Sequence, residues 1–262
     1  MNPPTSPSPE LEVHSLTVGY DRRPVITDFS FTVSKGEWVA ILGPNGSGKS
    51  TLLKTLAYII KPWEGDILLR GKPLSKFTRR TISQYIAWVP ERSELSFPFS
   101  VEDTVLMGRY PYNSRNPTRE DWSIARWAME LMEVYELRAR NVLELSAGEY
   151  RRVMLARALA QQPLILMLDE PSAHLDVKHQ AHIFKLLSEL HKKGQAIIIA
   201  SHNLNLVSLF VPKVILIKDG TKRREGITRQ VLTESILTEI YDTELSLLKH
   251  PEYDIPIFLP ER

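Results

Sequence analysis

The feature that most constrains this chain is a glycine-rich stretch that fits the pattern G-x-x-x-x-G-K-[ST]. It follows an apolar run at residues 38–42, typical of a buried strand, and precedes apolar residues at helical spacing. A strand, a glycine loop and a helix N-terminus together bind phosphate, because glycines let backbone N–H groups approach the anion and the helix end adds partial positive charge. The predicted loop comprises Gly43, Pro44, Asn45, Gly46, Ser47, Gly48, Lys49, Ser50 and Thr51.

Two side chains of this loop carry the expected chemistry. We expect Lys49 to reach the β- and γ-phosphates of a nucleotide, and the Ser50 hydroxyl to ligate Mg²⁺. The alternative is a plain glycine turn between a strand and a helix. It is disfavoured because the sequence context fits a phosphate loop on both sides.

Composition limits the class of protein. The chain has 262 residues, enough for one large domain or two small ones, and its net charge of +2 gives no reason to expect nucleic acid. Its basic pairs, among them Arg151-Arg152, are scattered and are expected to be solvated. The absence of cysteine excludes disulfides and thiolate metal sites, and no apolar run approaches the roughly 18 residues that cross a bilayer. We therefore expect a cytosolic chain that reaches a membrane only through a partner.

The pattern of apolar segments predicts an α/β fold. Residues 1–10 contain four prolines and are expected to form a disordered tail. Alternating segments at residues 11–20 and 29–33 indicate half-buried strands. Continuous apolar runs indicate strands covered on both faces, as in parallel sheets. These runs are residues 38–42, 86–89, 164–168 and 196–200.

The middle of the chain is predicted to be helical. Helices are expected at residues 101–108, 118–137 and 177–193. A helical insert therefore lies between about residues 91 and 162. The last forty residues are expected to be mixed helix and loop.

Two acidic residues follow the apolar run at residues 164–168. Asp169 and Glu170 form the Walker B pattern. In a chain that also has a phosphate loop, this pattern indicates a nucleotide site rather than an ordinary charged loop after a strand. We expect Asp169 to hold Mg²⁺ through water, and Glu170 to polarise the attacking water as a general base.

A second anion site is predicted where a serine and small residues precede a long helix, since a hydroxyl, free N–H groups and the helix dipole meet there. The segment is Leu145, Ser146, Ala147, Gly148 and Glu149. It resembles the LSGGQ signature of ABC-type ATPases. With the phosphate loop, the Walker B acids and Ser201-His202, it makes residues 11–248 similar to a whole ABC nucleotide-binding domain, with residues 249–262 as a C-terminal extension.

The resemblance implies a P-loop NTPase core of the RecA-like type, with a mostly parallel sheet and an antiparallel β piece, plus a helical subdomain at about residues 91–162. It implies that ATP and Mg²⁺ bind, that Tyr20 stacks on adenine and that His202 contacts the γ-phosphate. Two copies are expected to sandwich two ATP molecules, so that the signature segment completes the partner's site. Residues 172–176 resemble the D-loop, which in the family communicates between paired subunits.

Two positions depart from the family pattern. Glu91 stands where the Q-loop usually has a glutamine ligand of Mg²⁺; a carboxylate can still ligate the metal, but it adds negative charge near the phosphates. Ala147 replaces a signature glycine, and its methyl is tolerable if the backbone is helical and costly if φ is positive. The other catalytic residues are present, so ATP hydrolysis is still expected.

Residues 97–101 and 105–112 resemble segments of the ATPases of importers for ferric siderophores, haem and cobalamin, where Glu149 is also common. In the family, the segment after the Q-loop contacts a membrane permease, so residues 91–112 are the expected contact. The resemblance thus implies an energy-coupling ATPase, peripheral on the cytoplasmic face of the membrane, with a permease and indirectly a substrate-binding protein as partners. An importer of free metal ions or another cargo, a soluble non-transport ABC ATPase and a catalytically weak regulatory subunit stay open as alternatives.

Overall fold

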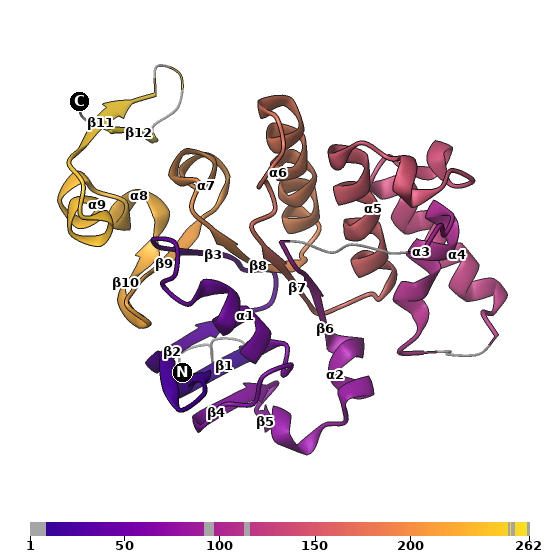
Figure 1. Cartoon of the computed structure of the whole chain (residues 1–262), viewed down its shortest axis with the longest axis horizontal. Helices are drawn as coiled ribbons and strands as arrows, with labels where there is room; N and C mark the ends of the chain where they lie inside the picture. The colour runs from indigo at the N-terminus through magenta and orange to yellow at the C-terminus, as the bar shows by residue number, and fades with distance from the viewer. Residues whose placement is uncertain (1–8, 92–96, 113–115, 251, 253–254, 261–262) are drawn as a thin grey trace, which may run out of the picture.

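The computed structural model describes residues 9–91, 97–112, 116–250, 252 and 255–260. Two sheets lie next to one another, with a helical region at the right of the view and a C-terminal hairpin at the upper left (Figure 1). Helix α1 (Lys49–Leu56) contacts strands of both sheets.

The antiparallel sheet forms from early strands of the chain. In spatial order its described strands are β2 (Arg23–Val33), β1 (Leu11–Tyr20), β4 (Glu64–Leu69) and β5 (Lys72–Pro73). Leu11 and Val13 on β1 are buried in one cluster with Leu52 of α1. This sheet is the antiparallel piece that the sequence predicts.

The larger sheet is mostly parallel, and only its edge strand β10 runs antiparallel to its neighbour among the described strands. In spatial order it consists of β10 (Thr221–Ile227), β9 (Lys213–Lys218), β3 (Trp38–Leu42), β8 (Ala196–Ser201), β7 (Ile165–Asp169) and β6 (Ile86–Val89). Because parallel strands end at the same edge, the segments that follow β3, β7 and β8 meet there.

Side chains from both faces of this sheet are buried. On one face of the sheet, Trp38 packs in a cluster with residues of α5 (Ala147–Ala160) and α6 (Val177–Lys192). On the opposite face, Val39 packs in a cluster with residues of α1. The remaining helices of the core region are α2 (Arg79–Tyr85), α7 (Leu204–Phe210), α8 (Thr228–Val231) and α9 (Glu234–Tyr241). Short 3₁₀ turns lie at Leu74–Lys76, Met107–Arg109, Tyr135–Leu137 and Val142–Glu144.

Between β6 and β7 the described chain is helical. Its helices α3 (Val101–Leu106), α4 (Arg119–Leu131) and α5 (Ala147–Ala160) pack against one another. Thr118 is the N-cap of α4 and forms a capping box with Asp121, so the helix begins where it is predicted, but it ends at Leu131 rather than residue 137. Glu133 has φ of 55°, a left-handed conformation that stops the helix.

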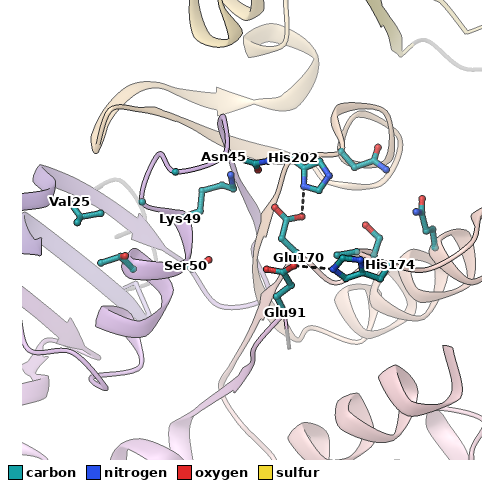
Figure 2. A pocket seen from close by; sticks show the side chains of 15 residues that line it. Val25, Asn45, Lys49, Ser50, Glu91, Glu170, His174 and His202 are labelled. Carbon is teal, nitrogen blue, oxygen red and sulfur yellow. Dashed lines mark ion pairs between the residues drawn. The ribbon is translucent and has the colours of Figure 1, made fainter. Parts of the chain in front are cut away.

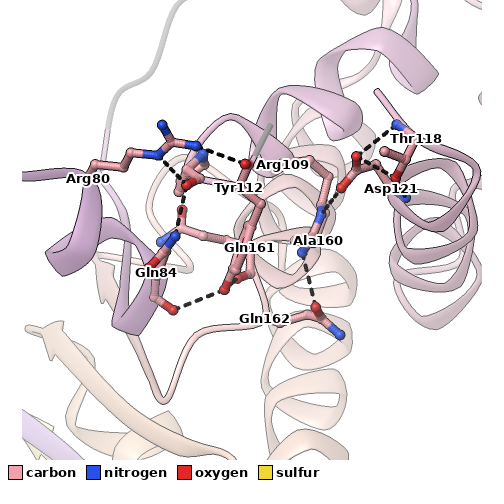
Figure 3. A network of polar contacts seen from close by, with 10 residues as sticks. Arg80, Gln84, Arg109, Tyr112, Thr118, Asp121, Ala160, Gln161 and Gln162 are labelled. Carbon is pink, nitrogen blue, oxygen red and sulfur yellow. Dashed lines mark hydrogen bonds and ion pairs between the residues drawn. The ribbon is translucent and has the colours of Figure 1, made fainter. Parts of the chain in front are cut away.

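A polar network joins this helical region to the core (Figure 3). Arg109 donates to Asp121 Oδ1 at 2.8 Å and to the carbonyl of Ala160 at 2.8 Å. On the core side, Arg80 of α2 donates to the carbonyl of Tyr112 at 2.8 Å. The buried ion pair and the Ala160 contact therefore hold the helical region together, and the Arg80 contact attaches its Tyr112 segment to α2.

Ordered structure lies on both sides of the two predicted terminal boundaries. Residues 1–8 of the predicted tail lie outside the described residues, but Glu10 is ordered: its N–H donates to the Val33 carbonyl at 2.9 Å and its carboxylate pairs with Arg70. These partners of Glu10 are distant in sequence, so local composition does not indicate them. At the other end, β11 (Leu245–Lys249) and β12 (Pro256–Pro260) form a hairpin, so the boundary expected after residue 248 falls within a strand.

Candidate active site

A cleft of about 610 Å³ opens at the carboxyl ends of β3, β7 and β8 (Figure 2). It brings together most of the phosphate loop with Glu91, Glu170 and His202, as the sequence predicts. The lining residues are Val25, Asn45, Gly46, Gly48, Lys49, Ser50, Thr51, Glu91, Glu170, Ser172, Ala173, His174, Gln180, His202 and Asn203. Tyr20, half exposed at the end of β1, is not part of this lining.

The glycines of the phosphate loop are required by its shape. A methyl group at Gly43 would lie 2.1 Å from the Ile217 carbonyl oxygen, and Gly48 has φ of 100°, which side chains rarely adopt. Lys49 Nζ donates to the carbonyls of Gly43 at 2.7 Å and Pro44 at 3.0 Å. Burial lowers the pKa of Lys49, while the nearby Glu170 and Asp169 carboxylates raise it.

Several polar atoms of the loop and the Walker B acids lack partners. The hydroxyl of Ser47 and Oδ1 of Asp169 are buried without a hydrogen-bond partner among the described residues. Burial raises the pKa of Asp169, and a hydrogen bond from Ser50 opposes that shift. Buried polar groups normally have partners, so this arrangement fits a bound polyanion and cation. Ser50, Asp169 and Glu91 present the oxygen donors that Mg²⁺ prefers.

Glu170 and His202 meet across the ends of β7 and β8. His202 Nδ1 lies 2.9 Å from Glu170 Oε2, but without the alignment of a hydrogen bond, so that oxygen has no hydrogen-bond partner in the part of the chain described. The backbone of Glu170 is left-handed, with φ of 45°, and its N–H donates to the Ala200 carbonyl at 2.9 Å. Glu170 therefore lines the cleft, with Oε2 of its carboxylate buried beside His202.

Arg151 is a site residue that the sequence analysis misjudged, since we expected a solvated side chain and it is 7% exposed. Its guanidinium donates to the carbonyls of Pro90 at 2.7 Å and Asp169 at 2.8 Å, with longer bonds to Glu91 at 3.3 Å and Glu170 at 3.2 Å. Burial lowers the pKa of Arg151 to about 10, although the nearby carboxylates act to raise it.

The signature segment forms the N-terminus of α5, away from the lining of this chain's own cleft. Ser146 is the N-cap: its hydroxyl accepts from the Glu149 N–H, and the Glu149 carboxylate accepts from the Ser146 N–H at 2.8 Å. Ala147 is the first residue of α5 and does not have a positive φ, so its methyl causes no backbone strain. Ser146 and Ala147 are exposed, whereas Gly148 is buried.

Comparison with known proteins decides the family. The sequence profile of the ABC transporter family matches residues 26–173, more than half of the chain. The chain belongs to this family. A hemin import ATP-binding protein of Thermobifida fusca is 36% identical over 258 residues, which cover 98% of this chain and 91% of the relative. An iron(3+)-hydroxamate import ATP-binding protein of Bacillus subtilis is 34% identical over 252 residues, or 95% of this chain and 94% of that protein.

Solved structures agree with the sequence relatives of this ABC ATPase. An inward-facing metal-chelate type ABC transporter superposes with a TM-score of 0.85 at 28% identity, covering 97% of this chain and 98% of that chain. A dimeric ATP-binding cassette with bound ADP and Pi superposes with a TM-score of 0.73 at 26% identity, covering 84% and 99%. The predicted P-loop NTPase fold and the predicted ATPase activity are confirmed. None of the helices described here is long and apolar enough to cross a bilayer.

Proposed function

We propose that this ABC ATPase powers the import of a metal chelate, namely a ferric siderophore, haem or cobalamin. The observation that carries the proposal is the 0.85 TM-score to a metal-chelate type ABC transporter over 97% of the chain. The names of the hemin and iron(3+)-hydroxamate relatives, and a 35% identical cobalamin import ATP-binding protein of Halobacterium salinarum, support the same cargo class. These comparisons favour it over free metal ions or a soluble, non-transport role.

The catalytic roles follow from the cleft. Loop N–H groups and Lys49 would bind the β- and γ-phosphates, and Tyr20 would stack on adenine from the end of β1. When bound, Mg²⁺ would be held by Ser50, Asp169 and Glu91 and would neutralise negative charge on the phosphates.

Glu170, whose side chain lines the cleft, would receive the proton of the attacking water. His202, 2.9 Å away, would orient that carboxylate and contact the γ-phosphate. Most of the catalysis would then come from positioning and from electrostatic stabilisation of the transferred phosphoryl group.

ATP would bind between two copies. Ser146, Ala147, Gly148 and Glu149 lie outside the lining of their own chain's cleft, which supports a role at the partner's nucleotide. The dimeric cassette with ADP and Pi gives the precedent for such a pair. We further propose that residues 11–248 constitute the nucleotide-binding domain, with the helical subdomain at about residues 91–162.

The permease would bind near the segment that follows Glu91, of which residues 92–96 lie outside the described part. Phe97 is 67% exposed and Tyr110 is 56% exposed, and exposed aromatic side chains of this kind mark interaction surfaces. Beside Tyr110 is a groove of about 410 Å³ whose lining includes Trp88 and Met107. Such a contact would hold the chain at the cytoplasmic face of the membrane, and the substrate-binding protein would act on it only through the permease.

The test is ATP hydrolysis in membrane discs after co-expression with the permease genes that neighbour this gene. Binding proteins loaded with siderophore, haem or cobalamin are added in turn. We expect one loaded binding protein to stimulate hydrolysis and the unloaded forms to have little effect. Steady hydrolysis that ignores every permease and cargo would contradict the transport role.

A further inference from the structure

His179, in the first turn of α6, occupies the space beside the signature residue Gly148. A methyl group at Gly148 would lie 2.3 Å from Cδ2 of His179 and 2.9 Å from its Nε2. Gly148 does not have a positive φ, so its backbone conformation is open to any residue. The imidazole ring of His179 therefore occupies the space that a side chain at this position of the signature would need.

Asp176, the N-cap of α6, fixes this ring in place. Asp176 Oδ1 accepts the backbone N–H of His179 at 2.8 Å and lies 2.7 Å from His179 Nδ1. These hydrogen bonds hold the pKa of the Asp176 carboxyl below its usual range. Because an ionised carboxylate only accepts, the proton of the pair lies on Nδ1, and Cδ2 and Nε2 face the start of α5.

A short hydrogen-bonded turn connects Asp176 to the catalytic carboxylate. Glu170 begins the turn, and its carbonyl accepts the Ala173 N–H at 3.1 Å. The Ser172 carbonyl then accepts the Leu175 N–H at 3.4 Å, and Ser172 itself is buried. Leu175 directly precedes Asp176, so the turn that begins at Glu170 ends at the N-cap that holds the ring.

We propose that His179 is a positioning residue: held by Asp176 at the end of the Glu170 turn, its ring keeps the signature at Gly148 in the position that contacts the ATP of the second copy. The inference rests on the proposed ATP-driven pairing. Each copy would then present a correctly placed signature to the partner's nucleotide. The ring itself need not touch either nucleotide.

The first experiment measures ATP-dependent pairing of the full-length chain in the Glu170→Gln background, where slow hydrolysis preserves the pair. Sedimentation with Mg²⁺ and ATP gives the dimer dissociation constant, and a fluorescent ATP analogue at low protein concentration gives the affinity of the single chain. We expect His179→Ala to raise the dimer dissociation constant at least about tenfold and to leave the ATP affinity of the single chain unchanged. His182→Ala is the matched control, since His182 lies on the same helix but pairs with Glu133 at 3.1 Å.

The second experiment uses the steric contact between the two residues. Gly148→Ala alone places its methyl against the ring and should weaken pairing severely. Adding His179→Ala removes the clash, so the double variant should pair more tightly than Gly148→Ala alone. That rescue is not expected from a variant that merely misfolds, and thermal unfolding of each variant is recorded alongside.

The outcomes separate the inference from the proposed function. If the Glu170→Gln parent does not pair with ATP, the proposed function is wrong and this inference falls with it. If the parent pairs and His179→Ala pairs equally well, only the inference is overturned. Failure of His179→Ala to rescue Gly148→Ala would also overturn it, because the ring would not be what a side chain at Gly148 meets.

Discussion

Glu91 Oε1 and His174 Nε2 lie 3.4 Å apart at the mouth of the cleft (Figure 2). Glu91 follows β6, whereas His174 belongs to the turn after Glu170 and has a left-handed backbone with φ of 61°. The side chain that replaces the usual Q-loop glutamine is therefore paired with a residue of the D-loop-like segment. It also adds negative charge beside Asp169, whose pKa it helps to raise.

Replacing Glu91 by glutamine should improve nucleotide binding. The change removes one negative charge near the phosphates, worth about 0.5–1 kcal/mol at such a partly solvated site, so KM for MgATP should fall about two- to fivefold. Steady-state hydrolysis against MgATP concentration measures this. Glu133→Gln is the control, because Glu133 is also paired with a histidine, His182, but does not line the cleft, and its KM should not change. A KM that rises in Glu91→Gln would mean that the carboxylate serves more as a metal ligand than as a repulsive charge.

Glu170→Gln should abolish most turnover while leaving ATP binding intact. An amide of nearly the same shape keeps the packing at the end of β7 but cannot accept a proton from water, and loss of a general base costs about 10²–10⁴-fold. Single-turnover hydrolysis and a nucleotide-binding titration together test this. Glu130→Gln, at an exposed helix position paired with Arg126, should behave as wild type. Near-normal turnover in Glu170→Gln would show that Glu170 is not the general base.

Arg151→Lys should lower both stability and turnover. The ammonium group keeps the charge but cannot span the carbonyls of Pro90 and Asp169 at once, so buried acceptors lose partners at a cost of about 2–3 kcal/mol in the free energy of unfolding. The same carbonyls belong to the segments that carry Glu91 and Glu170, so kcat should fall on the order of tenfold through misplacement. Urea unfolding and kcat measurements check both effects. Arg126→Lys, an exposed pair on α4, should change neither; equal effects in the two variants would contradict the role of Arg151.

Local patterns explain why much of the fold was predictable. The strand of residues 38–42 has its predicted bounds because an uninterrupted apolar run and the following glycine loop define both ends. The start of α4 was predictable from the Thr118 and Asp121 pair, which are three residues apart. By contrast, β11 and β12 are short strands that pair with each other, and β12 also contacts α7. Local composition does not reveal such contacts, so it indicated only loop and helix.

The candidate site was predictable to the extent that its chemistry lies in motifs. The meeting of Glu170 and His202 follows from two neighbouring parallel strands that end together. The role of Arg151 did not follow, because a buried guanidinium that binds backbone carbonyls has no sequence partner to reveal it. The contact of His179 with Gly148 is similarly invisible in the sequence, since it joins the first turns of two helices that are distant along the chain.

The capping box of Ser146 and Glu149 should make the effect of a cap deletion depend on pH. Ser146→Ala should cost about 1 kcal/mol at pH 7 through loss of the N-cap. Hydrogen bonds from Ser146 lower the pKa of Glu149 from its ordinary value of 4.5, so the carboxylate binds protons less readily in the folded chain than in the unfolded one. This part of the stability is present above pH 4.5 and is lost as pH falls through the folded pKa, although solvent screening limits it to a few tenths of a kcal/mol.

Urea unfolding of wild type and Ser146→Ala at pH 7 and at pH 4 should therefore show a smaller difference at the lower pH. The matched control is the same pair of proteins in a Glu149→Gln background, where the amide keeps the size of the side chain and does not titrate. There the cost of Ser146→Ala should be equal at both pH values, because the pH dependence in wild type comes from Glu149 alone. A difference that widens at pH 4, or that narrows equally in the Glu149→Gln background, would show that the hydrogen bonds to Ser146 are not what lowers the pKa of Glu149.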